Sequence, residues 1–254
     1  MNPTLLEIYQ NHQGLASDKW TSYLTEYQRL LAPYQDQKIT LVEIGVQNGG
    51  SLQIWEKFFP LACRIIGCDI DSGCEHLPFN SPIIKIIIGD ITNSNTINQI
   101  IQASTKSIDI VIDDGSHVSG DIVSAFFGLF PAINHGGLFI AEDLHCSYWP
   151  DFEGGLARPD SSIAFFKMLS DIVNYEHWGT DKSRVEYLQS HFPQAKDCEV
   201  ALSKIHSIEF VNSLCVVRKR FAEQNLLGPR FIAGKEEYVC QIKQKNGQIS
   251  KPLL

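Results

Sequence analysis

Several features that mark other protein classes are missing from this sequence. No stretch approaches the ~18 consecutive apolar residues of a membrane-spanning helix, and the N-terminus has no basic start followed by an apolar run. Acidic side chains outnumber basic ones by 29 to 21, so the basic footprint of a nucleic-acid-binding protein is also missing. We therefore expect a cytoplasmic protein that has neither a membrane nor a nucleic acid as a partner.

Two familiar motifs are absent as well. The seven cysteines include no CxxC pair, which argues against a zinc or thioredoxin-like site, and without a signal peptide we expect reduced thiols. The GxGxxG fingerprint of dinucleotide-binding folds does not occur. What remains is an ordinary globular composition, with 44% hydrophobic and 20% charged residues in 254 positions. This length and composition fit one folded domain.

Short runs rich in Ile, Val and Leu alternate with helical patterns after residue 38. The runs are typical of buried parallel strands and cover 39–44, 64–68, 83–88, 108–112 and 138–141, with helices expected at 50–59, 94–104 and 119–130. Two later strands, 203–210 and 214–218, are separated by only three residues and should form an antiparallel hairpin. The sequence thus predicts an α/β fold of the Rossmann-like, doubly wound type, with a mostly parallel seven-stranded sheet and a C-terminal antiparallel hairpin.

The regions outside the alternating pattern define the expected domain organisation. Residues 1–37 should be a helical extension, whose helix ends at Pro33. Residues 38–220 should be the main domain, with a lid loop at about 144–162 and a helix at 162–174. Residues 221–254 should be a C-terminal tail. An apolar stripe at helical spacing supports the extension. It comprises Trp20, Tyr23, Leu24, Tyr27, Leu30 and Leu31.

The first strand leads into a glycine-containing turn and then a helix. Gly45 allows close approach of the backbone to a ligand, and Ser51 stands at the start of the helix, whose free N–H groups suit an anion. Glu43 would repel a pyrophosphate, whereas an acidic turn suits the sulfonium and amino group of S-adenosylmethionine. A plain strand–turn–helix connection is the alternative.

Acids also follow the second and third strands. Asp69 stands where a carboxylate can accept both hydroxyls of a ribose. Asp90 could accept from an adenine amino group while Ile91 packs on the ring. A solvated acid or helix cap at 69, and an Asx turn at 90, are the structural alternatives.

The fourth and fifth strands each end in a pair of acids and a histidine. These are Asp113, Asp114 and His117, and then Glu142, Asp143 and His145. Adjacent strands would bring the carboxylates together, and a hard divalent cation would relieve their repulsion. A helix cap at Asp113 and a loop acid at Asp143 are the structural alternatives, and either histidine could be the base.

At these residues the sequence resembles a known family. It is similar to the class I S-adenosylmethionine-dependent methyltransferases, most of all to the metal-dependent sugar O-methyltransferases of macrolide biosynthesis (the mycinamicin type), and shares the metal pattern of the cephalosporin hydroxylase-like family. The similarity covers about 14–155, with a weaker echo near 205–219. The matching stretches are 17–20 (SDKW), 43–51, 67–70, 111–117 (VIDDGSH), 129–131, 136–138, 142–150 (EDLHCSYWP) and Gly154-Gly155.

The resemblance implies a role for each matching residue. Asp114, Glu142 and Asp143 would bind Mg²⁺ or another divalent cation, and His117 would be the general base, with Asp114 beside it at the catalytic centre. The cofactor S-adenosylmethionine would be lined by Glu43, Gly45, Ser51, Asp69, Asp90 and Asp113.

The reaction implied is methylation of a hydroxyl on a sugar or glycosylated natural product, with a small-molecule acceptor as partner and a homo-oligomer as one possible assembly. The large N-terminal domain of some relatives would be missing. Methylation of a phenol or catechol, or cofactor binding without catalysis, are the alternatives. Tyr148, Trp149 and Phe152 could stack on a flat ligand face.

Overall fold

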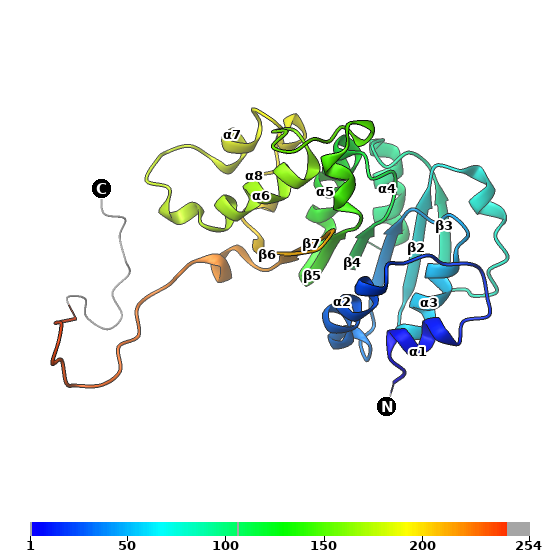
Figure 1. Cartoon of the computed structure of the whole chain (residues 1–254), viewed down its shortest axis with the longest axis horizontal. Coiled ribbons are helices and arrows are strands. Elements are labelled where there is room, and N and C mark those ends of the chain that lie inside the picture. The colour runs from blue at the N-terminus through cyan, green and yellow to red at the C-terminus, as the bar shows by residue number, and fades with distance from the viewer. Residues whose placement is uncertain (1, 106, 243–254) are drawn as a thin grey trace.

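A seven-stranded sheet forms the centre of the computed structural model, which describes residues 2–105 and 107–242 (Figure 1). The strand order is β3-β2-β1-β4-β5-β7-β6. Strands β1 to β5 pair in parallel, and β7 runs antiparallel to both β5 and β6. The predicted mostly parallel, doubly wound sheet with its antiparallel C-terminal hairpin is confirmed.

The strands lie within a few residues of the positions expected from their apolar runs. Their bounds are β1 Thr40–Ile44, β2 Arg64–Asp69, β3 Ile84–Ile88, β4 Ile108–Asp113, β5 Ile133–Ala141, β6 Ile205–Val211 and β7 Leu214–Lys219. The largest difference is in β5, which begins five residues before the expected 138. Polar and glycine residues at 134–137 hid this part of the strand from an argument based on apolar runs.

Helices cover both faces of the sheet and bury two apolar layers. Helices α1 (Leu5–Gln10), α2 (Thr21–Leu31) and α3 (Gly50–Phe58) lie on one face. On the other face lie α4 (Ser94–Ala103), α5 (Ser119–Leu129) and α6 (Ser162–Val173), with the short α7 (Arg184–Leu188) and α8 (Glu199–Leu202) beyond (Figure 1). Phe126 is in the second layer and contacts the rings of Phe130, Phe139 and Phe165.

The N-terminal region differs from the expected continuous helical extension. It consists of two helices, α1 and α2, separated by an irregular segment that includes 13–20, and a 3-10 turn Ala32–Tyr34 containing Pro33 follows α2. Trp20 was expected on the apolar stripe of the helix. It instead precedes the first helical residue, and its side chain is 59% exposed.

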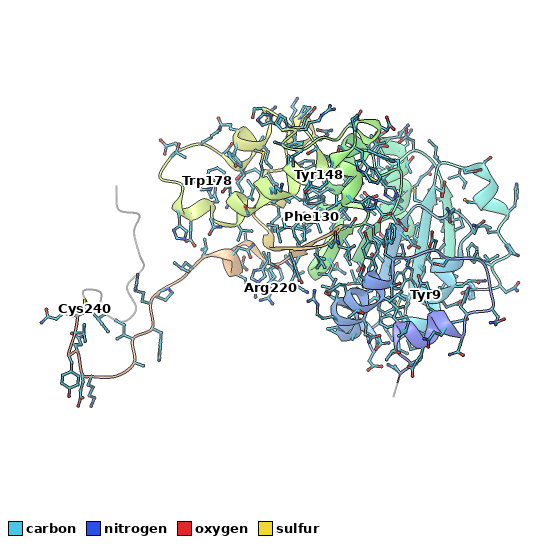
Figure 2. The ribbon with its side chains drawn as sticks, viewed as in Figure 1. Tyr9, Phe130, Tyr148, Trp178, Arg220 and Cys240 are labelled. Carbon is cyan, nitrogen blue, oxygen red and sulfur yellow. The ribbon has the colours of Figure 1, made fainter. Side chains whose placement is uncertain are left out.

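The expected lid and tail regions are irregular and contain short 3-10 turns. The 144–162 region contains two 3-10 turns, Leu144–Tyr148 and Pro150–Phe152, before α6 begins. After the 3-10 turn Ala222–Asn225 the chain runs away from the sheet toward Cys240 (Figure 2), and the remainder of the 221–254 tail, from 243, lies outside the described residues. Within the described ranges, no helix has the length and apolar character needed to cross a membrane. All seven cysteines are free thiols.

Candidate active site

A cavity of about 660 Å³ opens at the carboxyl ends of the parallel strands. Its walls come from the turns that follow β1, β2, β3 and β4, from Asp143 after β5, and from residues 16–19 of the N-terminal segment. The sheet order reverses between β1 and β4, and ligands in open α/β sheets bind in the crevice at this point. The cavity therefore lies where the fold favours a binding site.

Gly45 allows the turn after β1 to pack directly against the turn after β4. Its φ is +88°, and a Cβ atom added there would lie 2.0 Å from the carbonyl oxygen of Asp114. The amide of Asp114 also donates to the carbonyl oxygen of Ile44 at 2.9 Å. Gly45 was predicted to allow close approach of a ligand. In the structure it also allows close approach of the backbone at Asp114, one of the predicted metal ligands.

Glu43 and Ser51 occupy different positions relative to the cavity. Ser51 lines it, whereas Glu43 is fully buried behind the turn and does not. Glu43 accepts hydrogen bonds from the Ser51 hydroxyl at 2.6 Å and from the Trp55 indole N–H at 3.1 Å. Burial raises the pKa of Glu43, and the nearby Lys19 ammonium partly offsets this. Glu43 therefore packs behind the Gly45 turn and does not line the cavity.

Asp69, the acid at the end of β2, is in the cavity wall and contacts the same turn. One carboxylate oxygen accepts from the amides of Val46 and Gln47 at 2.7 and 3.0 Å, and the other accepts from the amide of Asp71 at 2.9 Å. Burial would raise its pKa, but these three amide donors stabilise the anion and leave the pKa lowered. Asp69 is therefore an ionised acceptor facing the cavity.

Asp90 and Ile91 also line the cavity, at the end of β3. The Asp90 carboxylate accepts from the side-chain hydroxyl and the amide of Thr92 at 2.7 and 2.8 Å, and both bonds lower its pKa. This is the Asx turn that was the structural alternative for this motif. Asp90 still lines the cavity, so the Asx turn does not prevent its carboxylate from contacting a ligand.

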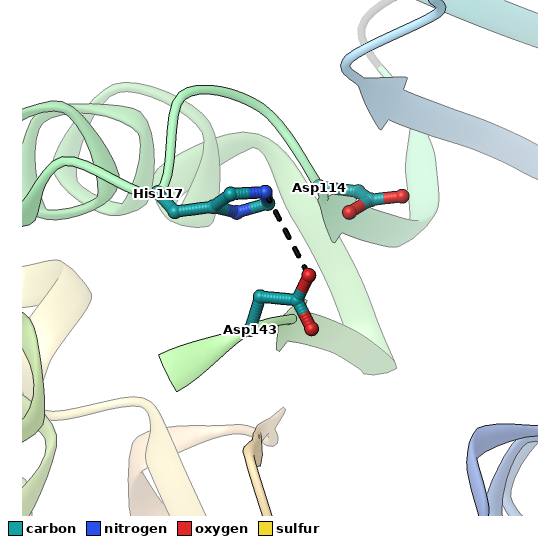
Figure 3. Close-up of side chains that lie close together, drawn as sticks. All are labelled: Asp114, His117 and Asp143. Atoms are coloured by element: carbon teal, nitrogen blue, oxygen red, sulfur yellow. Dashed lines mark ion pairs between the residues drawn. The ribbon is translucent and has the colours of Figure 1, made fainter. Parts of the chain in front are cut away.

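Asp114, His117 and Asp143 point toward one another at the edge of the cavity (Figure 3). One potential ligand atom from each residue lies within 4.8 Å of the other two, and His117 Nε2 is 3.7 Å from Asp143 Oδ2. His117 and Asp143 have positive φ values of 58° and 52°. Non-glycine residues held in this region cost about 1–3 kcal/mol each and cluster at functional sites.

Glu142 is not a member of this three-residue cluster, although Lys19 contacts both Glu142 and Asp114. Its side chain is buried, and one carboxylate oxygen accepts from the Tyr27 hydroxyl at 2.5 Å and from the Lys19 ammonium at 2.7 Å. Burial raises the pKa of Glu142, and the adjacent Lys19 charge partly offsets this. The predicted ligands Asp114 and Asp143 lie together in the structure, while Glu142 is held by Lys19 and Tyr27.

Asp113 is buried next to Asp114 and does not line the cavity. Its Oδ1 accepts weakly from the Gly115 amide at 3.4 Å, and its Oδ2 has no partner. Burial raises its pKa to about 7. Asp113 does not cap the following helix, which begins at Ser119 without a side-chain cap, and its contact with a cofactor stays a prediction.

The N-terminal segment supplies site residues to which the sequence argument gave no role. Lys19 pairs with Asp114 as well as Glu142. Trp20 Nε1 and the Tyr23 hydroxyl donate to Asp143 Oδ1 at 3.0 and 2.8 Å. The only indication in the sequence that this segment belongs to the site was the similarity of the SDKW stretch to the sugar methyltransferases. Trp20 and Tyr23 had been interpreted as core residues of the apolar stripe.

His145 lies farther from the cavity than His117. Its Nδ1 is 2.6 Å from the Ser213 hydroxyl and 3.9 Å from Asp143 Oδ1. Its ring packs between Trp20 and Trp149, with centroid distances of 6.1 and 4.9 Å. A smaller cavity of about 300 Å³ on its other side is lined by His145, Tyr148 and the β6–β7 turn. The structure thus places His117, and not His145, in the main cavity.

Comparison with known proteins agrees with this geometry. Residues 22–128 match the model of the FtsJ-like methyltransferase family. The matched stretch is less than half of the chain.

Curated relatives narrow the comparison to enzymes that act on sugars. The chain is 36% identical over 178 residues to 8-demethyl-8-alpha-L-rhamnosyl tetracenomycin-C 2'-O-methyltransferase of Streptomyces olivaceus, covering 66% of this chain and 46% of the relative. It is 33% identical over 173 residues to mycinamicin VI 2''-O-methyltransferase of Micromonospora griseorubida, covering 64% and 42%. The chain therefore spans slightly under half the length of these relatives.

A solved structure extends the likeness over most of the chain. The structure of MycE methyltransferase from the mycinamycin biosynthetic pathway, in complex with Mg and SAH, matches with a TM-score of 0.73 and 26% identity. The match covers 87% of this chain and 55% of that one. The fold is thus the Rossmann-like methyltransferase fold, and the resemblance to the mycinamicin-type sugar methyltransferases is confirmed.

Proposed function

We propose that this protein transfers a methyl group from S-adenosylmethionine to a hydroxyl group of a sugar on a small-molecule natural product, with the help of a divalent cation. The observation that carries the proposal is the position of Asp114, His117 and Asp143 at the edge of a cavity whose walls include Gly45, Asp69 and Asp90. Both relatives named above are O-methyltransferases by name, one of them for a rhamnosyl tetracenomycin, and the MycE structure holds Mg and SAH.

Different walls of the cavity suit the ribose, the adenine and the methionine part of S-adenosylmethionine. The ionised Asp69 offers a carboxylate to the ribose hydroxyls, and Asp90 with Ile91 forms the wall where an adenine would lie. Ser51 and the Gly45 turn form the wall toward the methionine end. Together these residues position the methyl group near the strand ends that carry Asp114 and Asp143.

The chemistry of the donor set fits a divalent cation. Carboxylate oxygens of Asp114 and Asp143 are hard ligands of the kind that Mg²⁺ prefers, and three donors leave coordination positions for water or substrate hydroxyls. Such an ion would lower the pKa of a hydroxyl bound to it and orient that hydroxyl toward the methyl group. Glu142 accepts from Lys19 and Tyr27 through the same oxygen, Oε1.

His117 is the residue placed to accept the proton of the acceptor hydroxyl. Asp143 faces its Nε2 at 3.7 Å, and Asp143 is itself held by Trp20 and Tyr23. An imidazole is available as a base near pH 7, and a carboxylate beside it stabilises the imidazolium that forms. The N-terminal segment thus orients Asp143, and Asp143 in turn orients His117.

Exposed aromatic side chains beside the cluster suit a flat acceptor face. Trp20 and Trp149 are 59% and 49% exposed, and both rings contact His145 edge-on. Sugar faces and aromatic rings both stack on such side chains. A phenol or catechol acceptor is the second candidate, and a cofactor-binding protein without turnover is the third.

A methylation screen separates the three candidates. The protein is incubated with methyl-labelled S-adenosylmethionine, Mg²⁺ and a panel of rhamnosides and other glycosides, with catechols and phenols in parallel. We expect label in the glycoside fraction. Label only in the phenolic fraction would replace the sugar assignment, and cofactor binding by calorimetry without any labelled product would indicate a binding protein.

Substitution of Asp69 tests the cofactor site. We expect Asp69→Ala to weaken S-adenosylmethionine binding at least tenfold, because a charge-assisted hydrogen bond contributes roughly 1.5–3 kcal/mol. Isothermal titration measures the affinity, and the exposed Asp181→Ala is the control. Because Asp69 also accepts from the turn amides, Asp69→Asn is measured as well. Unchanged affinity in both folded variants would remove Asp69 from the ribose site.

The same proposal covers the organisation and setting of the chain. Residues 38–220 would form the methyltransferase domain, with 1–37 as an extension that completes the site and 144–162 as a lid. The free thiols agree with a reducing, cytoplasmic location. A homo-oligomer stays a prediction.

A further inference from the structure

Lys19 is a buried cation among three carboxylates. Its side chain is 2% exposed, and its ammonium contacts Asp114 and lies 2.7 Å from Glu142 and 3.9 Å from Glu43. Burial opposes the charge, but the three carboxylates together raise the pKa of Lys19 well above its usual value. A buried charge of this kind is stable only with such partners.

Asp114 has two competing partners in this arrangement. The Asp114 oxygen that contacts Lys19 is Oδ2, and the same carboxylate belongs to the cluster with His117 and Asp143. A divalent ion bound by Asp114 would lie within a few ångströms of the ammonium, where two like charges repel strongly in a buried environment. Glu142 is open to the same competition, since it accepts from Lys19.

The backbone around Lys19 is held independently of these acids. The carbonyl oxygen of Ala16 accepts from the amide of Gly50 at 3.1 Å, and the amide of Leu15 donates to the Gln53 side chain at 2.8 Å. Helix α2 begins at Thr21, just after Lys19. Lys19 is among the residues that line the 660 Å³ cavity, next to the exposed Asp18.

We propose that Lys19 is a built-in counterion of the metal site, which neutralises Asp114 and Glu142 in the metal-free protein and is replaced at these carboxylates when a divalent cation binds. The proposal rests on the metal-assisted function proposed above. Lys19 is then a positioning residue: it keeps the acids in place before the ion arrives. Its departure frees Glu142 to become a third carboxylate ligand beside Asp114 and Asp143.

Manganese binding tests this exchange without any measurement of turnover. The free Mn²⁺ signal in electron paramagnetic resonance gives the affinity of the wild type, of Lys19→Met, and of the exposed control Lys38→Met. We expect Lys19→Met to bind Mn²⁺ at least tenfold more tightly than wild type, because a competing positive charge is gone, and Lys38→Met to match the wild type. We also expect Mn²⁺ to raise the melting temperature of Lys19→Met by more than that of the wild type.

The possible results are distinct. Wild-type or weaker Mn²⁺ affinity in Lys19→Met would show a merely structural lysine and overturn the exchange. A wild type that binds no Mn²⁺ would overturn both this proposal and the metal-assisted function. In the first case, Mn²⁺ binding by the wild type leaves the metal-assisted function standing.

A measurement on the unaltered chain covers the case in which Lys19→Met does not fold without an ion. Reductive methylation followed by peptide mass spectrometry reports which lysines are accessible. We expect Lys19 to stay unlabelled in metal-free protein and to become labelled at saturating Mg²⁺, with Lys38 labelled in both. Equal protection of Lys19 with and without Mg²⁺ would contradict its displacement.

Discussion

Removal of divalent cations is expected to abolish methyl transfer, and addition of Mg²⁺ or Mn²⁺ to restore it. The reason is that the acceptor hydroxyl holds its proton tightly at neutral pH, and coordination to a divalent ion supplies several kcal/mol of charge stabilisation. We expect the rate after chelation and desalting to fall below about 1% of the initial rate. Product formation from labelled S-adenosylmethionine measures it.

Two variants connect this loss to the cluster in Figure 3. Asp143→Asn keeps the shape of the side chain but weakens both the ligand and the partner of His117, so it should need far more Mg²⁺ for turnover. Asp151→Asn, an exposed acid in the 144–162 region, is the matched control and should behave as wild type. Full activity after rigorous metal removal would contradict the metal mechanism and favour acid–base catalysis by the side chains alone.

Replacement of His117 by alanine is expected to lower turnover by about 10²–10⁴-fold, the usual contribution of a general base. Cofactor affinity should stay near the wild-type value, because Asp69 and Asp90 lie on other strand ends. The rate constant at saturating substrates is the measurement, and the exposed His191→Ala is the control.

The metal affinity of His117→Ala separates the two roles that its position allows. His117 Nε2 can take the acceptor proton or can bind the ion, since it lies with the donors of Asp114 and Asp143. Mn²⁺ affinity unchanged by the substitution identifies the base, and a large loss of affinity identifies a ligand. If the variant kept more than about a tenth of the wild-type rate, His117 would be neither, and His145→Ala would be examined next.

Much of this architecture was predictable from the order of residues. Buried parallel strands need apolar side chains on both faces, so apolar runs such as 108–112 predicted the strands. The three-residue connection at 211–213 is too short for a crossover helix and predicted the hairpin. The meeting of Asp114 with Asp143 followed from the pairing of β4 with β5. These features depend on local pattern and on the general geometry of α/β sheets.

The remaining features depend on contacts between distant parts of the chain. Lys19 lies 95 positions from Asp114, and nothing in its neighbourhood indicates a buried ammonium. Glu43 was expected to face the cofactor because it precedes Gly45, but alternate residues of a strand face opposite sides, and its side chain packs toward Ser51 and Trp55 of α3. Trp20 fits the helical spacing, yet it immediately precedes the helix and its side chain donates to Asp143.

The contact of Gly45 with the Asp114 carbonyl has a consequence for protein engineering. With 2.0 Å between that oxygen and any added Cβ, and a φ of +88°, position 45 accepts no other side chain unless the turn after β4 moves. Attempts to widen cofactor tolerance by varying the first glycine turn would therefore shift the backbone that carries Asp114. Libraries aimed at new methyl donors or new acceptors should leave this position fixed and vary residues 16–18 of the cavity wall and the exposed Trp149.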